Sequence, residues 1–237
     1  KKGNLSSVTL AVSLVFGGNT IAANPCIDKS RDFEESETYS VDGVDTVRSK
    51  RADQLVMIKI DPEETLTLQN TNKEKRSRVI KSEKGNIVFF GGNLILQKSD
   101  DSTNYGYSDS YNRHFIRVSE GALLTVDTQS TVMEGSVAPR GVVLSGMGLF
   151  TRGFTMNVDR STVDLSPQRT FGADVRPDGF LNTKFADITM TAGAQDPKMN
   201  GIRVWHGGRF SAESLSLQLN GSGSKNLEYI DALYVGQ

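Results

Sequence analysis

The 237-residue chain carries 27 Lys and Arg against 28 Asp and Glu, a formal net charge of −1. This balance excludes a generally basic nucleic-acid binder, and the single cysteine, Cys26, excludes both an intramolecular disulfide framework and a thiolate zinc site. With 37% hydrophobic residues and 23 glycines, the composition is that of a globular chain slightly rich in glycine. The length fits one all-β domain or two ordinary domains.

The N-terminal segment, residues 1–23, has the three parts of a secretory signal peptide. Two lysines precede an apolar run over 5–16, and the small residues Ala22 and Ala23 follow it. The run is shorter than the roughly 20 apolar residues that cross a bilayer, which disfavours the alternative of a transmembrane anchor. We therefore predict an exported protein whose mature chain begins near residue 24.

Cys26 lies just after the predicted cleavage site. A lipid anchor on this cysteine is disfavoured, because Asn24 and Pro25 occupy positions where acyl-anchored proteins usually carry small residues. In an exported chain a single cysteine is instead a free thiol or the partner in an intermolecular disulfide.

Beyond residue 55, a repeat of about 28 residues organises the chain. Segments of alternating apolar and polar residues flank turns that contain Gly in most copies, as in Val118-Ser-Glu-Gly-Ala-Leu-Leu-Thr-Val126. Alternation with a period of two predicts strands that bury one face, and recurrence of the same corner predicts stacked coils. The corner position recurs, at intervals of 27 to 31 residues, at 64, 92, 121, 148, 179, 208 and 236.

We therefore predict an all-β fold, a right-handed parallel β-helix of about seven coils over residues 56–237. Inward Leu, Val, Ile and Phe side chains would stack at roughly 4.8 Å per coil. Glycine at a corner permits a positive φ, where a Cβ would clash. An antiparallel β-sandwich also has short strands and regular turns, but it gives no reason for one corner to recur seven times.

Residues 24–55 lie outside this repeat and are dense in charge. A solenoid needs a polar cover over its first coil, since an open strand edge pairs with other chains. We expect 24–55 to form an N-terminal cap, with a disordered linker as the alternative. At the other end, residues 230–237 enter a strand and a corner and stop within a coil. We expect the sequence to be part of a longer protein.

The export signal followed by Gly-cornered coils such as 118–126 resembles the passenger region of type V autotransporters, in the pertactin and AIDA-type adhesin group. The resemblance covers 56–237 as a pattern and includes no site-specific motif. It implies a parallel β-helix at the bacterial surface or in the medium, acting as an adhesin or a structural stalk. It also implies a C-terminal outer-membrane β-barrel in the same polypeptide, whose series of about ten-residue strands this sequence lacks.

The strongest candidate for ligand binding is the loop between Gln97 and Phe115. It is rich in Tyr, Ser, Asn, Gly and Asp, a mixture typical of binding loops, where rigid aromatic side chains lie beside adaptable hydrogen-bonding groups. The alternative is a solvated insertion. The expected partner is a host cell-surface receptor or glycan. The candidate binding residues are Tyr105, Tyr107, Tyr111, Asn112, Arg113 and His114.

A second candidate is a basic run expected to project as a loop between two strands. Its side chains are suited to sulfated glycans or anionic lipid, and a solvated corner is the alternative. The residues of this possible polyanion patch are Lys73, Lys75, Arg76, Arg78 and Lys81.

Signals for catalysis are weak. His114 and His206 are the only histidines, and no Gly-x-Ser-x-Gly elbow occurs. We therefore expect no enzyme activity, no cofactor, no metal site and no nucleic-acid partner. The alternative is a secreted β-helical polysaccharide lyase or hydrolase built on carboxylates beside arginines. Its candidate side chains are Asp159, Asp164, Asp174, Asp178 and Asp187, with Arg152, Arg160, Arg169 and Arg176.

Overall fold

The computed structural model describes residues 24–72, 77–98, 114–135, 140–161, 169–194, 196, 198–221, 224–225 and 227–236. The predicted signal peptide, residues 1–23, lies outside this part of the chain. The described residues form two parallel β-sheets and no helix. None of these segments therefore has the length and hydropathy of a membrane-spanning helix.

The chain alternates between the two sheets. The eight-stranded sheet contains β1 (Arg31–Phe33), β2 (Glu37–Val41), β4 (Leu55–Asn70), β6 (Asn86–Lys98), β8 (Leu124–Gly135), β10 (Gly148–Asp159), β12 (Phe180–Thr191) and β14 (Arg209–Asn220). The seven-stranded sheet contains β3 (Asp45–Ser49), β5 (Arg78–Glu83), β7 (His114–Ser119), β9 (Arg140–Leu144), β11 (Arg169–Val175), β13 (Lys198–Val204) and β15 (Tyr229–Val235).

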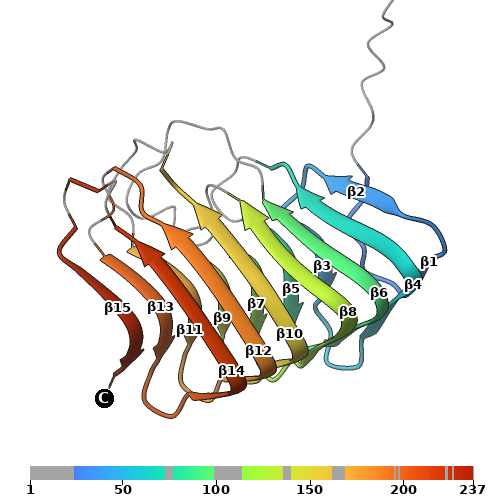
Figure 1. The fold of residues 1–237 in the computed structure, drawn as a ribbon. Coiled ribbons are helices and arrows are strands. Elements are labelled where there is room, and N and C mark those ends of the chain that lie inside the picture. The colour runs from blue at the N-terminus through green and yellow to red at the C-terminus, as the bar shows by residue number, and fades with distance from the viewer. Residues whose placement is uncertain are drawn as a thin grey trace, which may run out of the picture.

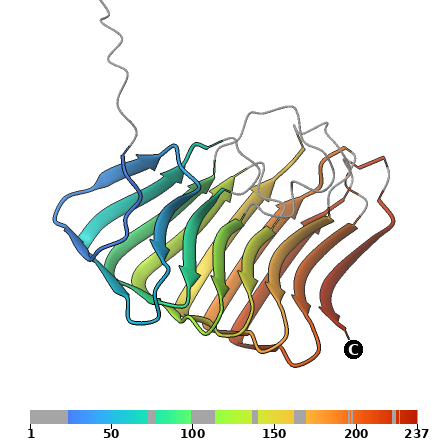
Figure 2. The same cartoon turned by 180° about the vertical axis from the view of Figure 1, so that it is seen from behind.

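The two sheets face each other, and each turn of the chain adds one layer to both (Figures 1 and 2). β1 and β2 pair with the two halves of β4 and so form one layer. Each later coil adds one long strand to the eight-stranded sheet and one shorter strand to the seven-stranded sheet. The prediction of a parallel β-helix of about seven coils is confirmed.

Rows of apolar side chains hold the coils together. In one row of the eight-stranded sheet, six residues lie directly above one another, and all but the last are fully buried or nearly so. Full burial of such a side chain contributes about 1.5–3 kcal/mol. The row consists of Leu68, Leu96, Met133, Met156, Ile188 and Leu217.

The predicted corner is the turn that leads from the seven-stranded sheet into the eight-stranded sheet. At equivalent positions of five successive coils the backbone there is left-handed, a conformation that glycine adopts without steric cost. Glycine occupies three of the five positions. The residues and their φ values are Lys84 (68°), Gly121 (85°), Gly146 (80°), Asp178 (58°) and Gly207 (78°).

The predicted repeat needs two corrections. Positions 121, 148, 179 and 208 lie at this turn or within two residues of it, but Glu64 and Gly92 lie inside β4 and β6. The coil length also varies over a wider range than the predicted 27 to 31 residues. Met133 is 23 residues from Met156, its partner in the next coil, and 37 residues from Leu96, its partner in the previous coil. The connections from the eight-stranded sheet to the seven-stranded sheet differ in length, and this sets the variation.

Residues 24–55, predicted to be a cap or a linker, form the first coil of the β-helix. Phe33 pairs with Ile60, Tyr39 with Leu68, and Val47 with Ile80. The first member of each pair is buried in the same core cluster as the later coils. This segment therefore contributes apolar side chains to the core, in addition to the charged side chains that cover its outer surface.

Candidate functional site

The residues of the predicted binding loop fall into two groups. Five of the six lie outside the described residues: Tyr105, Tyr107, Tyr111, Asn112 and Arg113. His114 is the first residue of β7 and is only 1% exposed. Since Lys98, the last residue of β6, is also buried, the connection 99–113 begins and ends at buried positions. Because His114 is buried, it is not an exposed residue that could contact a ligand, which corrects its prediction as a binding residue.

The predicted polyanion patch is also divided. Lys73, Lys75 and Arg76 lie outside the described residues. Arg78 belongs to β5, is buried, and donates from Nη1 to Asp45 Oδ1 at 3.3 Å. Arg78 is therefore a paired strand residue, which corrects its prediction as a loop cation. Lys81 is half-buried in the same strand and donates to Glu83.

The structure instead brings together basic residues from three coils on the outer face of the seven-stranded sheet. Arg48 of β3 pairs in register with Lys81 of β5, and Lys81 pairs with Arg117 of β7. Neighbouring strands lie about 4.8 Å apart, so one cation follows another along the axis of the β-helix. All three are half-buried, while their neighbours Val47, Ile80 and Ile116 point into the core.

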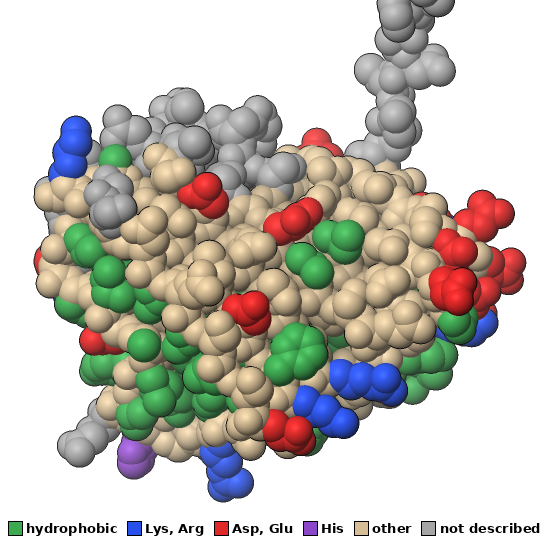
Figure 3. Space-filling model, in the orientation of Figure 1, with side chains coloured by type: hydrophobic (Ala, Val, Ile, Leu, Met, Phe, Trp, Pro, Cys, Tyr) green, Lys and Arg blue, Asp and Glu red, His purple; other side chains and the backbone are tan. Residues whose placement is uncertain are grey.

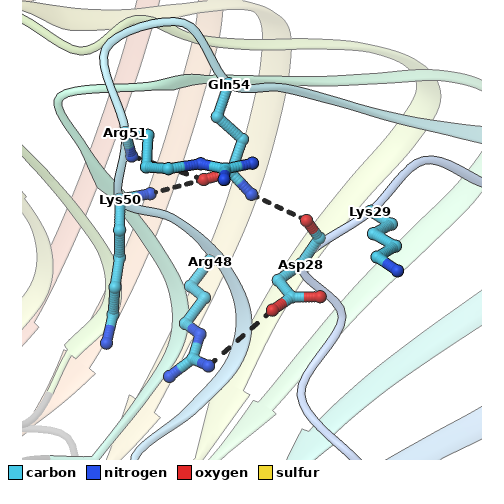
Figure 4. Close-up of a pocket in the computed structure, with 6 residues that line it drawn as sticks. All are labelled: Asp28, Lys29, Arg48, Lys50, Arg51 and Gln54. Atoms are coloured by element: carbon cyan, nitrogen blue, oxygen red, sulfur yellow. Dashed lines mark hydrogen bonds and ion pairs between the residues drawn. The ribbon is translucent and has the colours of Figure 1, made fainter.

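A pocket of about 390 Å³ adjoins the first of these residues (Figure 4). Gln54 shapes it by accepting a hydrogen bond from the Lys50 backbone N–H at 2.8 Å and donating to the Asp28 carbonyl at 2.7 Å. Figure 4 shows the Arg48 and Lys50 side chains extending in the same direction. The lining residues are Asp28, Lys29, Arg48, Lys50, Arg51 and Gln54.

We call the cations of this region the basic face: Lys29, Arg48, Lys50, Arg51, Lys81 and Arg117. Three of them have an acidic partner, and two of these pairs are long: Arg48 with Asp28 at 3.8 Å and Arg51 with Asp53 at 4.0 Å. Solvated pairs of this kind contribute about 0–1 kcal/mol. Among the described residues, Lys29, Lys50 and Arg117 have no ion pair. The basic face therefore keeps an excess of positive charge.

Arg117 has the least favourable surroundings for a cation. Its Nε atom is buried and has no hydrogen-bond partner among the described residues. Burial lowers the pKa of Arg117, and the charges of Arg78 and Arg176 lower it further. Glu83 and Glu120 oppose this effect, but both carboxylates have other partners: Glu83 binds Lys81, which holds the pKa of Glu83 below its usual value, and Glu120 pairs with Lys84 at 3.5 Å. Since Nε is buried, an anion from solution can contact only the part of the Arg117 side chain that remains exposed.

The outer face continues toward the C-terminal coils as a second cluster. The fully buried Asp174 accepts hydrogen bonds from Arg203 Nε at 2.9 Å and Nη2 at 2.8 Å. It also accepts from Trp205 Nε1 and Arg176 Nε, both at 3.1 Å. The Arg203 guanidinium lies 3.8 Å from the centre of the Phe171 ring. Asp174 therefore holds two arginines in fixed positions on this face.

The carboxylates suggested for a polysaccharide-cleaving site do not converge. Asp174 lies on the seven-stranded sheet, Asp178 in the following turn, and Asp159 and Asp187 in strands of the other sheet. Asp164 lies outside the described residues. Among the described residues, no three His, Cys, Asp or Glu side chains form a group able to hold a metal ion.

A smaller groove of about 260 Å³ lies on the eight-stranded sheet. Phe150 and Phe180 line it with ring centroids 4.8 Å apart, and Asn182, Arg209 and Ser211 also belong to its lining. Figure 3 shows apolar side chains gathered toward the C-terminal coils on this side of the molecule. The groove is less charged than the basic face.

The chain matches no protein-family model, no curated protein and no solved structure. Its function therefore has to be inferred from the β-helix and the surfaces that it presents.

We predict that Cys26 reacts slowly with thiol reagents. Its side chain is half-buried, and burial raises the pKa of the thiol to about 11, with Arg48 opposing this rise and Asp45 adding to it. Only the thiolate is nucleophilic, so the pH profile of alkylation by iodoacetamide should have its midpoint near 11. The unfolded protein in urea is the control and should titrate near the usual value of about 8.5. A native midpoint near 8.5 would contradict the buried position.

Proposed function

We propose that the protein is exported and acts outside the bacterial cell as an adhesin or a structural stalk, in the manner of an autotransporter passenger. The observation that supports this most is the stack of seven coils with a continuous apolar core. Such a solenoid is a stiff rod with an extended surface, and it holds attached loops away from the surface that anchors it.

The places where the chain leaves the sheets support a recognition role. The connections from the eight-stranded sheet to the seven-stranded sheet differ in length between coils, whereas the turns that lead back are all short. The longest of these connections, 99–113, contains the three tyrosines of the predicted binding loop. Because equivalent strand ends stack along the axis, the strand ends from which these connections start lie along one edge of the rod.

Export is tested by expressing the complete gene in a Gram-negative host. We expect the mature N-terminus to lie near residue 24. We also expect protease added to intact cells under partly denaturing conditions to digest the β-helix, because the protein lies outside the cell. An uncleaved chain retained inside the cell would contradict the proposal.

The role of the tyrosine-rich connection is tested by changing Tyr105, Tyr107 and Tyr111 together to alanine. Truncated tyrosine hot spots cost about 2 kcal/mol or more each, so adherence should fall at least about tenfold while the unfolding midpoint stays unchanged. Tyr229→Ala, in β15, is a matched control because its ring is partly exposed but lies outside this connection. Equal adherence of the triple variant and the original protein would remove the assignment.

A further inference from the structure

We propose that the outer face of the seven-stranded sheet binds a linear anionic polysaccharide that lies along the axis of the β-helix. The negative groups of the ligand, sulfate or carboxylate, would contact the basic face coil by coil. This inference adds a ligand class to the proposed function, but it is a property of the folded chain and does not depend on export or on the tyrosine-rich connection.

The first support is the spacing of the cations. Arg48, Lys81 and Arg117 are register partners on consecutive coils, so their Cα atoms follow one another at about 4.8 Å. A polymer that runs across the strands meets a new cation on each coil. A small anion would use only one of them, whereas a linear polyanion uses all three and gains from each contact without a new loss of translational freedom.

The second support is the lack of internal neutralisation. Lys29 and Lys50 are exposed without an ion pair among the described residues, and Arg117 is half-buried without one. Charge-assisted hydrogen bonds are stronger at a partly desolvated group than in bulk water. Arg117 is half-buried without an ion pair among the described residues, so a sulfate or carboxylate group gains most by contacting the part of its side chain that remains exposed, since Nε itself is buried.

The third support is that the face continues beyond these three coils. In the register of the seven-stranded sheet, Arg117 pairs with Val143 of β9 and Val143 pairs with Asp174 of β11, so the cluster around Asp174 lies two coils beyond Arg117. There Arg176 remains partly exposed, and Arg203 stacks on Trp205 with its guanidinium carbon 4.6 Å from the ring centre. One buried carboxylate accompanies two arginines, so this end of the face also keeps a positive balance.

The chemistry of the face favours a polysaccharide over a single-stranded nucleic acid. Proteins that bind single strands combine cations with aromatic side chains on which successive bases stack. None of the residues that line the pocket or form the row of cations is aromatic, and at the other end of the face the Arg203 guanidinium already lies over the Phe171 and Trp205 rings.

The binding experiment uses the purified chain and the fluorescence of its single tryptophan, Trp205. The probes are heparin for a sulfated chain, polygalacturonate for a carboxylated chain, neutral dextran, and single-stranded DNA. We expect at least one of the two anionic polysaccharides to change Trp205 emission saturably, with an affinity that falls as salt rises from 50 to 500 mM. Dextran should have no effect. Binding of dextran, tighter binding of DNA, or no response to either anionic polysaccharide would overturn the inference.

Two single variants locate the site. Lys50→Ala and Arg117→Ala should each weaken binding of the responding polysaccharide about fivefold or more, because each removes one charge-assisted contact. Lys184→Ala is the matched control: Lys184 is exposed on β12 of the opposite sheet, and its loss changes the net charge equally. Equal weakening by all three variants would show a general charge effect and would overturn the proposed site.

The outcomes separate this inference from the proposed function. If Arg117→Ala fails to fold, Lys50→Ala still tests the site, because Lys50 is exposed and follows the end of β3. If the triple tyrosine variant loses adherence while the purified protein binds neither polysaccharide, the adhesin proposal stands and the basic face is not the site. Cleavage of the polysaccharide during the titration would favour the lyase or hydrolase alternative.

Discussion

Replacing Asp196 with alanine is expected to destabilise the protein by about 3–5 kcal/mol, because it removes the carboxylate that pairs with a buried arginine. Asp196 is fully buried and binds Arg160 through two hydrogen bonds, Nε to Oδ2 at 2.8 Å and Nη2 to Oδ1 at 3.2 Å. Its Oδ2 also accepts from the Thr170 hydroxyl at 3.2 Å and from the Gly193 backbone N–H at 2.8 Å. One carboxylate thus joins the connection after β12 to the end of β10 and the start of β11.

Urea unfolding of the Asp196→Ala protein measures this loss. Asp127→Ala is the matched control, since Asp127 also binds an arginine, Arg152, but both side chains are more than half exposed. An exposed pair contributes about 0–1 kcal/mol, so the control should lose no more than that. Equal losses in the two variants would show that burial does not decide the contribution of the carboxylate.

Replacing Gly91 with alanine is expected to destabilise the protein by at least about 3 kcal/mol, from a steric clash added to backbone strain. Gly91 lies in β6 at the bend of the long strand, with a φ of 103°. A Cβ at this position would lie 1.9 Å from the carbonyl oxygen of Ile60, its register partner in the previous coil. The two coils would have to separate at this point.

Gly121→Ala separates the two causes. Gly121 also has a positive φ, 85°, but a Cβ there meets no atom within 4 Å. The Gly121→Ala protein should therefore lose only about 1–2 kcal/mol of stability, which is the cost of placing a residue with a Cβ in a left-handed backbone conformation. Differential scanning calorimetry on both variants gives the comparison. A Gly91→Ala protein as stable as Gly121→Ala would contradict the close contact between coils at the bend.

The sequence carries the fold through two local signals. The alternation of residues such as Leu66 and Leu68, or Leu94 and Leu96, marks strands with one buried face, and the same side chains stack in the structure. Glycines such as Gly121 and Gly207 mark the recurring corner. The prediction of corners at Glu64 and Gly92 is wrong because the bend inside β4 and β6 also contains residues with a positive φ, Glu63 and Gly91.

The sequence contains a signal for the first coil that the prediction of a cap or a linker does not use. Phe33, Tyr39 and Val41 carry the apolar positions of β1 and β2, and all three are buried. The surrounding charges dominate the composition of this segment, and for that reason the composition predicts a cap or a linker. Apolar alternation at Tyr39 and Val41 is the feature that identifies a strand there.

The basic face could not be found by reading along the chain. Arg48, Lys81 and Arg117 are separated by 33 and 36 residues, and the coil lengths vary too much for a fixed period to align them. Only the register of the seven-stranded sheet brings them into one row. The Asp196–Arg160 pair has the same origin, since its two residues are 36 positions apart and meet through the stacking of coils.

The most direct test of this account is a set of distances along one outward row of the eight-stranded sheet. Thr67, Ile95 and Ser216 belong to that row. Thr67 lies five coils from Ser216, and Ile95 lies four coils from it. In a Cys26→Ser background, pulsed electron paramagnetic resonance on spin labels at 67 and 216, and at 95 and 216, measures both separations.

The stacked coils predict backbone separations of about 24 Å for 67–216 and about 19 Å for 95–216, at roughly 4.8 Å per coil. A third pair, 132–216, should be shorter by the same step, although 37 residues separate Ile95 from Val132 and only 28 separate Thr67 from Ile95. Equal steps per coil are the predicted result. Label separations that grow with the number of residues between the labels, and not with the number of coils, would contradict the β-helix and the basic face built on it. Separations that do not increase by the same step for each coil along the row would contradict them as well.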